Sequence, residues 1–408
     1  IQRAVDQNLD LRTAAKRVQE ARLHRGLKEA ESFPVLDASG STGWSRSNDQ
    51  TGAEHYGIGL DASWEIDLFG SVRRSIEAAD ADFQAQQERL RDVLVSLTAE
   101  VALNYVGLRT AQVQLANVSK SLETQQESLQ LVQWQHEAGL EGELAVHQAL
   151  YTVESSRART PELEHSIKTA MNRLAVLLGE RPGSLHEELK SAKPIPKIPA
   201  TVAVGLPADA LRRRPDIRQA ESELIAQTAR VGVATAALYP KLPLNGSIGI
   251  NALSFARFAE NFVNPAIWAE QIGLSTAQTL FDAGAVRKKI KIQSSQQRQA
   301  LIRYEATLLT ALEETENALT AYVQEQSKRD SLNRALQEAK QVLVLAEKSY
   351  KSGLIDFKTV LDSQRNLLSL DNQVAASESA MVVNLIQLYK ALGGGWPCCA
   401  AAALDSAR

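Results

Sequence analysis

The chain has 408 residues, and its 45 lysines and arginines against 48 aspartates and glutamates give a formal net charge of −3. This length is enough for two or three ordinary domains, and the near-neutral balance excludes the clustered basic excess of nucleic-acid-binding proteins. Aromatic residues make up only 5%, which is typical of long helices whose narrow seams bury small and medium side chains. No run of 18 apolar residues occurs, so no transmembrane helix is predicted.

The two ends of the chain carry little information about function. The sequence begins at Ile1 inside a helical pattern, without a Met, a basic segment or an apolar segment of a secretory signal, so we expect a mature or trimmed chain. Cys398 and Cys399 are the only cysteines. Adjacent cysteines rarely meet the geometry of a disulfide, and we expect a tail, 397–408, without a structural bridge.

Two copies of one unit make up the sequence. The Asp10–Pro34 stretch resembles Asp216–Pro240, and the numbers of the matching positions differ by 206. In three further pairs of motifs they differ by 214: Gly70–Arg73 with Gly284–Arg287, Gly139-Leu140 with Gly353-Leu354, and Leu178-Gly179 with Leu392-Gly393. Eight extra residues therefore lie between Pro240 and Gly284. We expect a first repeat over 1–193, a proline-rich connector over 194–207, which cannot be helical, and a second repeat over 208–396.

Alternating hydrophobicity predicts two strands in each repeat, over about 35–47 and 56–68 and over about 242–252 and 268–281. In the second strand one face is apolar, and the other carries Asp61, Glu65 and Asp67. Four strands in two isolated hairpins are too few for a sandwich within one chain. An apolar outer face and a polar inner face are typical of a closed barrel in lipid, so several chains must contribute. We expect Tyr56, Ile58, Leu60 and Trp64 to face lipid.

Long helices are predicted over about 71–138 and 142–179 in the first repeat and over about 285–352 and 355–392 in the second. No Gly or Pro interrupts 285–352, a helix of about 100 Å. Leucine or another apolar residue recurs every seven positions, as from Leu94 to Leu129, which favours antiparallel helical hairpins. Gly139 and Gly353 permit the turns, and Pro161 should split the first return helix near Thr160.

Together these features resemble the outer-membrane factors of the TolC/OprM type, and most closely their NodT-like efflux lipoproteins. The resemblance runs in order from about Ile1 to Trp396. It depends on Trp64–Gly70 (WEIDLFG), Gly205–Leu211 (GLPADAL), Arg213–Glu221 (RRPDIRQAE), Ala236–Pro240 (AALYP), Leu280–Gly284 (LFDAG), Tyr350–Gly353 (YKSG), Val360–Arg365 (VLDSQR) and Leu392–Trp396 (LGGGW).

The resemblance implies a mainly α fold with a small β part. It further implies a homotrimer with a 12-stranded β-barrel in the Gram-negative outer membrane and a 12-helix tunnel that spans into the periplasm. The function would be that of a passive gated duct of a tripartite efflux pump for drugs or other small toxic compounds. The implied partners are a periplasmic adaptor, an inner-membrane transporter and outer-membrane lipid. Lipid anchoring follows only from the subgroup, because the region that would hold the lipidated cysteine is absent from this sequence.

Candidate site residues lie at the hairpin ends. Asp362 and Arg365 share a helix face at i,i+3 spacing, and by themselves they could be a solvated ion pair of little consequence. The resemblance implies that they form the periplasmic gate together with Tyr350, although Lys358 stands where relatives place an apolar residue. Gly139, Leu140, Gly353 and Leu354 are candidates for adaptor docking, or simply form turns.

Enzymatic chemistry is not expected. None of the six histidines forms an H-x-x-x-H pair, and no phosphate-binding glycine loop occurs, so no catalytic, cofactor or metal site is predicted. A TolC-like duct for type I protein secretion remains an alternative. A soluble periplasmic adaptor or coiled-coil scaffold is a second one, although it leaves the alternation from Tyr56 to Leu68 unexplained.

Overall fold

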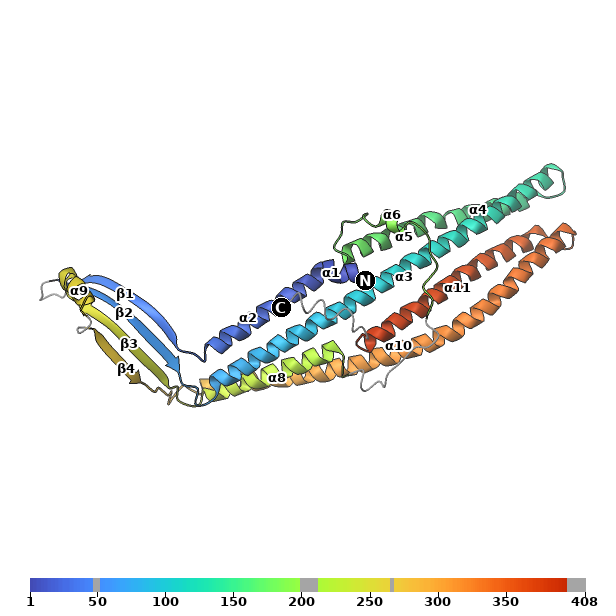
Figure 1. The fold of residues 1–408 in the computed structure, drawn as a ribbon. Coiled ribbons are helices and arrows are strands. Elements are labelled where there is room, and N and C mark those ends of the chain that lie inside the picture. Colours follow the sequence, from blue (N-terminus) through green and yellow to red (C-terminus); the bar gives the residue numbers. More distant parts are fainter. Residues whose placement is uncertain (47–51, 199–211, 265–267, 395–408) are drawn as a thin grey trace. The chain divides into compact units, whose positions relative to one another are not determined.

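The computed structural model describes residues 1–46, 52–198, 212–264 and 268–394, which are mainly helical with one small sheet (Figure 1). The helices are α1 (Gln2–Gln7), α2 (Leu9–Ala30), α3 (Ser71–Glu137), α4 (Glu143–Arg157), α5 (Arg159–Leu177), α6 (His186–Leu189), α8 (Pro215–Ala236), α9 (Phe255–Phe262), α10 (Ala285–Lys351) and α11 (Phe357–Ala391). The strands are β1 (Val35–Ser45), β2 (Ala53–Glu65), β3 (Pro243–Ala252) and β4 (Ala269–Leu274). Among the described residues, none of the helices is long and apolar enough to cross a membrane.

The chain divides into two compact units. The helical unit comprises Ile1–Lys16, Arg89–Ile217 and Leu308–Arg408, and the sheet unit comprises Arg17–Glu88 and Arg218–Thr307. Each unit combines segments from both repeats, so neither repeat is a compact body of its own.

The four strands form one antiparallel sheet in the order β1-β2-β3-β4. The expectation of two isolated hairpins is therefore wrong, because β2 of the first repeat pairs with β3 of the second. In this pairing Ile58 lies opposite Ile250 and Trp64 lies opposite Leu244. Since side chains alternate between faces, the register places the apolar residues of neighbouring strands on one face.

The last strand is shorter than expected. Alternation predicted a strand over 268–281, whereas β4 ends at Leu274, which lies opposite Leu244 near the start of β3. Beyond Leu244 the partner strand offers only Pro243, which has no N–H to donate, and one isolated bridge follows between Lys241 and Ala277. The strand β2 is shifted rather than shortened, because it runs from Ala53 to Glu65 instead of over 56–68.

The two long helices, α3 and α10, have 67 residues each, or about 100 Å at 1.5 Å per residue. On α3 the seven-residue seam is buried at Leu94, Val101 and Leu108. The return arm of the first hairpin is divided at Ala158, which separates α4 from α5. Pro161 lies in the first turn of α5, where a missing N–H leaves no helical bond unmade.

An unexpected helix, α9, lies in the connection between β3 and β4, within the region assigned the eight extra residues of the second repeat. It has eight residues and begins after Ser254, whose side chain accepts a hydrogen bond from the backbone N–H of Arg257. Such an N-cap supplies a partner for one of the free amides at the helix start.

A buried arginine joins three helices in the helical unit. The side chain of Arg214, which is 8% exposed, donates to both carboxylate oxygens of Asp216, to Glu314 on α10 at 2.7 Å and to the carbonyl oxygen of Ala391 on α11 at 2.8 Å. Burial alone would lower the pKa of Arg214, but the two carboxylates outweigh it and raise that pKa above its ordinary value. Arg214 therefore remains charged and fixes the end of α11 to the start of α8.

We expect Arg214→Ala to lower the free energy of unfolding by on the order of 3 kcal/mol, because it leaves a buried carbonyl and a partly buried carboxylate without their donor. Thermal unfolding of the detergent-solubilised chain measures the effect. Arg213→Ala, which truncates an exposed neighbour, is the matched control. Equal unfolding midpoints for the two variants would contradict the role assigned to Arg214.

Candidate functional site

The ends of four helices meet in one apolar cluster, here called the tip cluster. Its members come from α3, α4, α10, α11 and the turn between the last two helices. The buried members are Val132, Ala149, Ala346, Phe357, Val360 and Leu361, and the partly buried ones are Leu129, Ala145, Val146, Leu343, Tyr350 and Ile355. Six buried side chains of this size hold the two helical hairpins together at their ends.

Half of the tip cluster consists of equivalent positions of the two repeats. Val132 corresponds to Ala346, Leu129 to Leu343, and Val146 to Val360, all by the offset that relates the two turn glycines. Corresponding residues of the two hairpins therefore pack into one common cluster.

Both hairpins turn through the same backbone motif. Gly139 and Gly353 have φ angles of +73° and +71°, in the left-handed region that other residues disfavour. In each turn the glycine N–H binds the carbonyl three residues back, and the following leucine N–H binds the carbonyl five residues back. This is the Schellman motif, in which the residue after the glycine usually packs on the helix. Here Leu140 and Leu354 instead remain 77% and 76% exposed.

Tyr350 links the two hairpins by hydrogen bonds. Its hydroxyl is 2.5 Å from the side-chain oxygen of Gln135 at the end of α3 and 2.9 Å from a carboxylate oxygen of Glu141 in the turn that follows. Its ring lies 5.2 Å from that of Phe357. Burial, and next the hydrogen bond to Glu141, raise the pKa of Tyr350 to about 12, so the phenol remains a donor across the physiological range.

Arg365 makes a second link. It lies 3.4 Å from Asp362 on its own helix, donates to the Thr152 hydroxyl of α4 at 2.8 Å, and stands 5.4 Å above the ring of Tyr151. Asp362 and Arg365 are 48% and 42% exposed, so their ion pair is weak, whereas the contacts of Arg365 with α4 cross between hairpins. Next to Arg365, Gln364 donates to Ser128 on α3.

The residues predicted to form the gate lie on two helices of the second hairpin. Asp362 and Arg365 lie together on α11, whereas Tyr350 lies on α10 and bonds to the opposite turn. Sequence reasoning missed the partners of these residues on the first hairpin, namely Gln135, Glu141, Tyr151 and Thr152. The repeat held a signal for one of them, because Tyr151 is the position of the first repeat that corresponds to Arg365.

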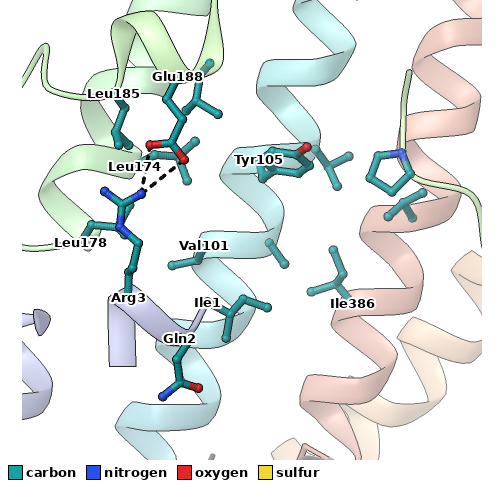
Figure 2. Close-up of a pocket in the computed structure, with 15 residues that line it drawn as sticks. Ile1, Gln2, Arg3, Val101, Tyr105, Leu174, Leu178, Leu185, Glu188 and Ile386 are labelled. Atoms are coloured by element: carbon teal, nitrogen blue, oxygen red, sulfur yellow. Dashed lines mark hydrogen bonds and ion pairs between the residues drawn. The ribbon is translucent and has the colours of Figure 1, made fainter. Parts of the chain in front are cut away.

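A cavity of about 560 Å³ lies elsewhere in the helical unit, between α1, α3, α5, α6 and α11 (Figure 2). Its wall is mostly aliphatic and includes Val101, Leu174 and Ile386. Arg3 closes one side through ion pairs with Glu188 at 3.0 Å and Glu180 at 2.6 Å. These groups fix α1 to the segment after α5. Within the described ranges, no cluster of three potential metal ligands was found.

The strand residues expected to face lipid lie on one face of β2. Ile58, Leu60 and Trp64 are 40%, 41% and 37% exposed, which is high for large apolar side chains in a sheet. The Trp64 indole donates to the carbonyl oxygen of Ser32 at 3.0 Å, so its polar edge is satisfied while its apolar surface remains open.

We expect Tyr350→Phe to loosen the contact between the hairpins by about 1–2 kcal/mol, because it removes the hydroxyl that bonds to Gln135 and Glu141. Hydrogen exchange of the amides around both turns should quicken roughly fivefold to thirtyfold. Tyr322→Phe, the same change on α10 farther from the turn, is the control. Unchanged hydrogen exchange in Tyr350→Phe would contradict the link between the hairpins.

The Tyr350 link should also weaken at high pH. The folded-state pKa of about 12 lies above the ordinary 10.0, so the folded state retains the proton longer and its stabilisation is complete below pH 10. The stability difference between the wild type and Tyr350→Phe should shrink as pH rises from 10.0 towards 12. Thermal unfolding at a series of pH values measures it, and a difference that grows over this range would contradict the assignment.

Comparison with known proteins covers nearly the whole chain. The family model described as outer membrane efflux protein matches residues 1–180 and 206–394. A solvent efflux pump outer membrane protein (SrpC) of Pseudomonas putida is 32% identical over 96% of this chain and 84% of its own length. A cation efflux system protein (CusC) of Escherichia coli is 30% identical over 97% and 85%. The outer-membrane channel OprN superposes with a TM-score of 0.92 and 36% identity over 97% of this chain and 89% of its own. The chain belongs to the outer membrane efflux protein family.

Proposed function

We propose that this chain is the outer-membrane channel subunit of a tripartite efflux pump, a passive gated duct for drugs or other small toxic compounds. The observation that carries the proposal is the four-stranded sheet with one apolar face, joined to two long helical hairpins in a chain of this family. The relatives named above serve solvent and cation efflux, which supports small compounds as the cargo.

The edges of the sheet support a barrel formed by several copies of the chain. In the part of the chain that the structure describes, β1 and β4 each pair on one side only. Lipid cannot satisfy an open edge, so a sheet within a membrane must close. Three copies, each contributing four strands, would close a 12-stranded barrel, and their helices would continue as a 12-helix tunnel.

The gate is proposed at Asp362, Arg365 and Tyr350. Threefold symmetry would place three Asp362 carboxylates around one narrow axis, where a ring of negative charge favours cations. Within each chain, Arg365 and Tyr350 hold the second hairpin to the first through Thr152, Gln135 and Glu141. Opening would require these bonds to break, so the same residues would both line and fasten the constriction.

We expect the double variant Asp362→Ala, Arg365→Ala to raise single-channel conductance in planar bilayers, because it removes the charged ring and the bond from Arg365 to Thr152. Asp371→Ala, which removes a carboxylate further along α11, should leave conductance as in the wild type. Unchanged conductance in the double variant would refute the gate assignment.

Docking of a periplasmic adaptor is proposed at Gly139, Leu140, Gly353 and Leu354. The exposure of both turn leucines supports it, because the Schellman motif normally covers the residue at this position. These two side chains offer apolar surface to a partner at the ends of both hairpins.

In a variant without Cys398 and Cys399, we expect Ser352→Cys next to the second turn to cross-link to a purified adaptor. Ser331→Cys, an exposed position on α10 about 30 Å from the turn by helical rise, is the matched control. An adduct at neither position under pumping conditions, or equal adducts at both, would contradict docking at the tips.

A further inference from the structure

The helix α9 is amphipathic. Phe255, Phe258 and Phe262 recur at i, i+3 and i+7, on one side of the helix with Ala259. The opposite side carries Arg257, Glu260 and Asn261. In a helix this short, three phenylalanines on one face give a large apolar surface for its length.

One edge of this apolar face packs on the sheet. The Tyr56 ring on β2 lies 5.8 Å from that of Phe255 and 6.1 Å from that of Phe258. Ile250 and Ala252, at the same end of β3, are only 1% and 7% exposed, although both belong to the apolar face of the sheet by register. The helix therefore lies at the end of β2 and β3 (Figure 1) and on the apolar side of the sheet.

Much of the apolar surface around α9 nevertheless remains uncovered. Phe255 is 64% exposed and Phe262 is 51% exposed, and the flanking Leu253 and Val263 are 72% and 78% exposed. The segment 253–263 thus holds four large apolar side chains open to the surroundings, and exposed apolar groups gathered on one short segment mark an interaction surface. It continues the apolar face formed by Tyr56, Ile58 and Leu60.

We propose that α9 with its flanking Leu253 and Val263 lies in the lipid–water boundary of the outer membrane, and that the occupant of its open apolar face is lipid. Its phenylalanines would enter the acyl region just below the headgroups, while Arg257 and Glu260 face water, as in other interfacial amphipathic helices. The inference rests on the proposed lipid-facing sheet, because α9 extends the same surface.

The length of β2 supports this position. From Tyr56 beside α9 to Glu65 the strand rises about 30 Å, which gives a height of roughly 23 Å at a tilt of about 40°. The apolar band of outer-membrane barrels is about 25 Å tall, with aromatic residues at both borders. Tyr56 and Trp64 stand near the two ends of this span, so α9 lies where one border of the band is expected.

Spin labels on the full chain test the proposal. In a variant with Cys398→Ser and Cys399→Ser, a nitroxide is attached at Phe262→Cys, at Glu260→Cys on the opposite side of α9, and at Ile58→Cys on the sheet. The protein is reconstituted in vesicles of phosphatidylethanolamine and phosphatidylglycerol. Collisions with oxygen, which concentrates in lipid, are compared with collisions with a water-soluble nickel chelate.

The expected ratio of oxygen to nickel collisions is severalfold higher at Phe262 and Ile58 than at Glu260. Equally low ratios at Phe262 and Glu260, together with a high ratio at Ile58, would place α9 in water. This result would overturn the inference on α9 alone. Protection of Phe262 from both reagents would mean that protein covers it, and would also overturn the inference. A label at Ile58 that avoids oxygen would instead overturn the lipid-facing sheet on which the inference rests.

Discussion

A helix as long as α3 or α10 has no core of its own, and it depends on a continuous apolar seam against neighbouring helices. At the turns the ends of both hairpins meet in one cluster, half of it made of equivalent residues from the two repeats. The turn glycines, the Tyr350 hydroxyl and the Arg365 guanidinium all occupy positions set by that cluster. Packing between the repeats thus comes first, and the polar links of the proposed gate depend on it.

Local patterns were enough to predict the long helices but not the pairing of the strands. The seven-residue seam, the absence of Gly and Pro over 285–352 and the glycines at 139 and 353 are local signals, and the helix ends lie close to where they indicate. The β2–β3 pairing joins strands from different repeats, far apart along the chain, and no local pattern specifies it. The early end of β4 depends on Pro243 of its partner strand, and α9 was hidden in an insertion whose length alone was apparent.

In the candidate site, too, local sequence patterns predict contacts within one helix but not contacts between distant segments. The proximity of Asp362 and Arg365 follows from helical spacing, so the sequence predicts it. The bonds from Tyr350 to Gln135 and Glu141 and from Arg365 to Thr152 cross between hairpins, and their partners depend on how the seams align. Repeat symmetry carries part of that information, since it relates Tyr151 to Arg365. It cannot supply the rest, because the two hairpins have diverged: His136 occupies the position that corresponds to Tyr350.

The boundary at Ala158 makes the return arms of the two hairpins different. The return arm of the first hairpin is divided into α4 and α5, whereas α11 is an uninterrupted rod of 35 residues. Arg365 is bound near one end of this rod, and the Ala391 carbonyl is held by Arg214 at the other. One unbroken helix, α11, therefore connects the tip cluster, to which it contributes Phe357, Val360 and Leu361, with the carbonyl held by Arg214.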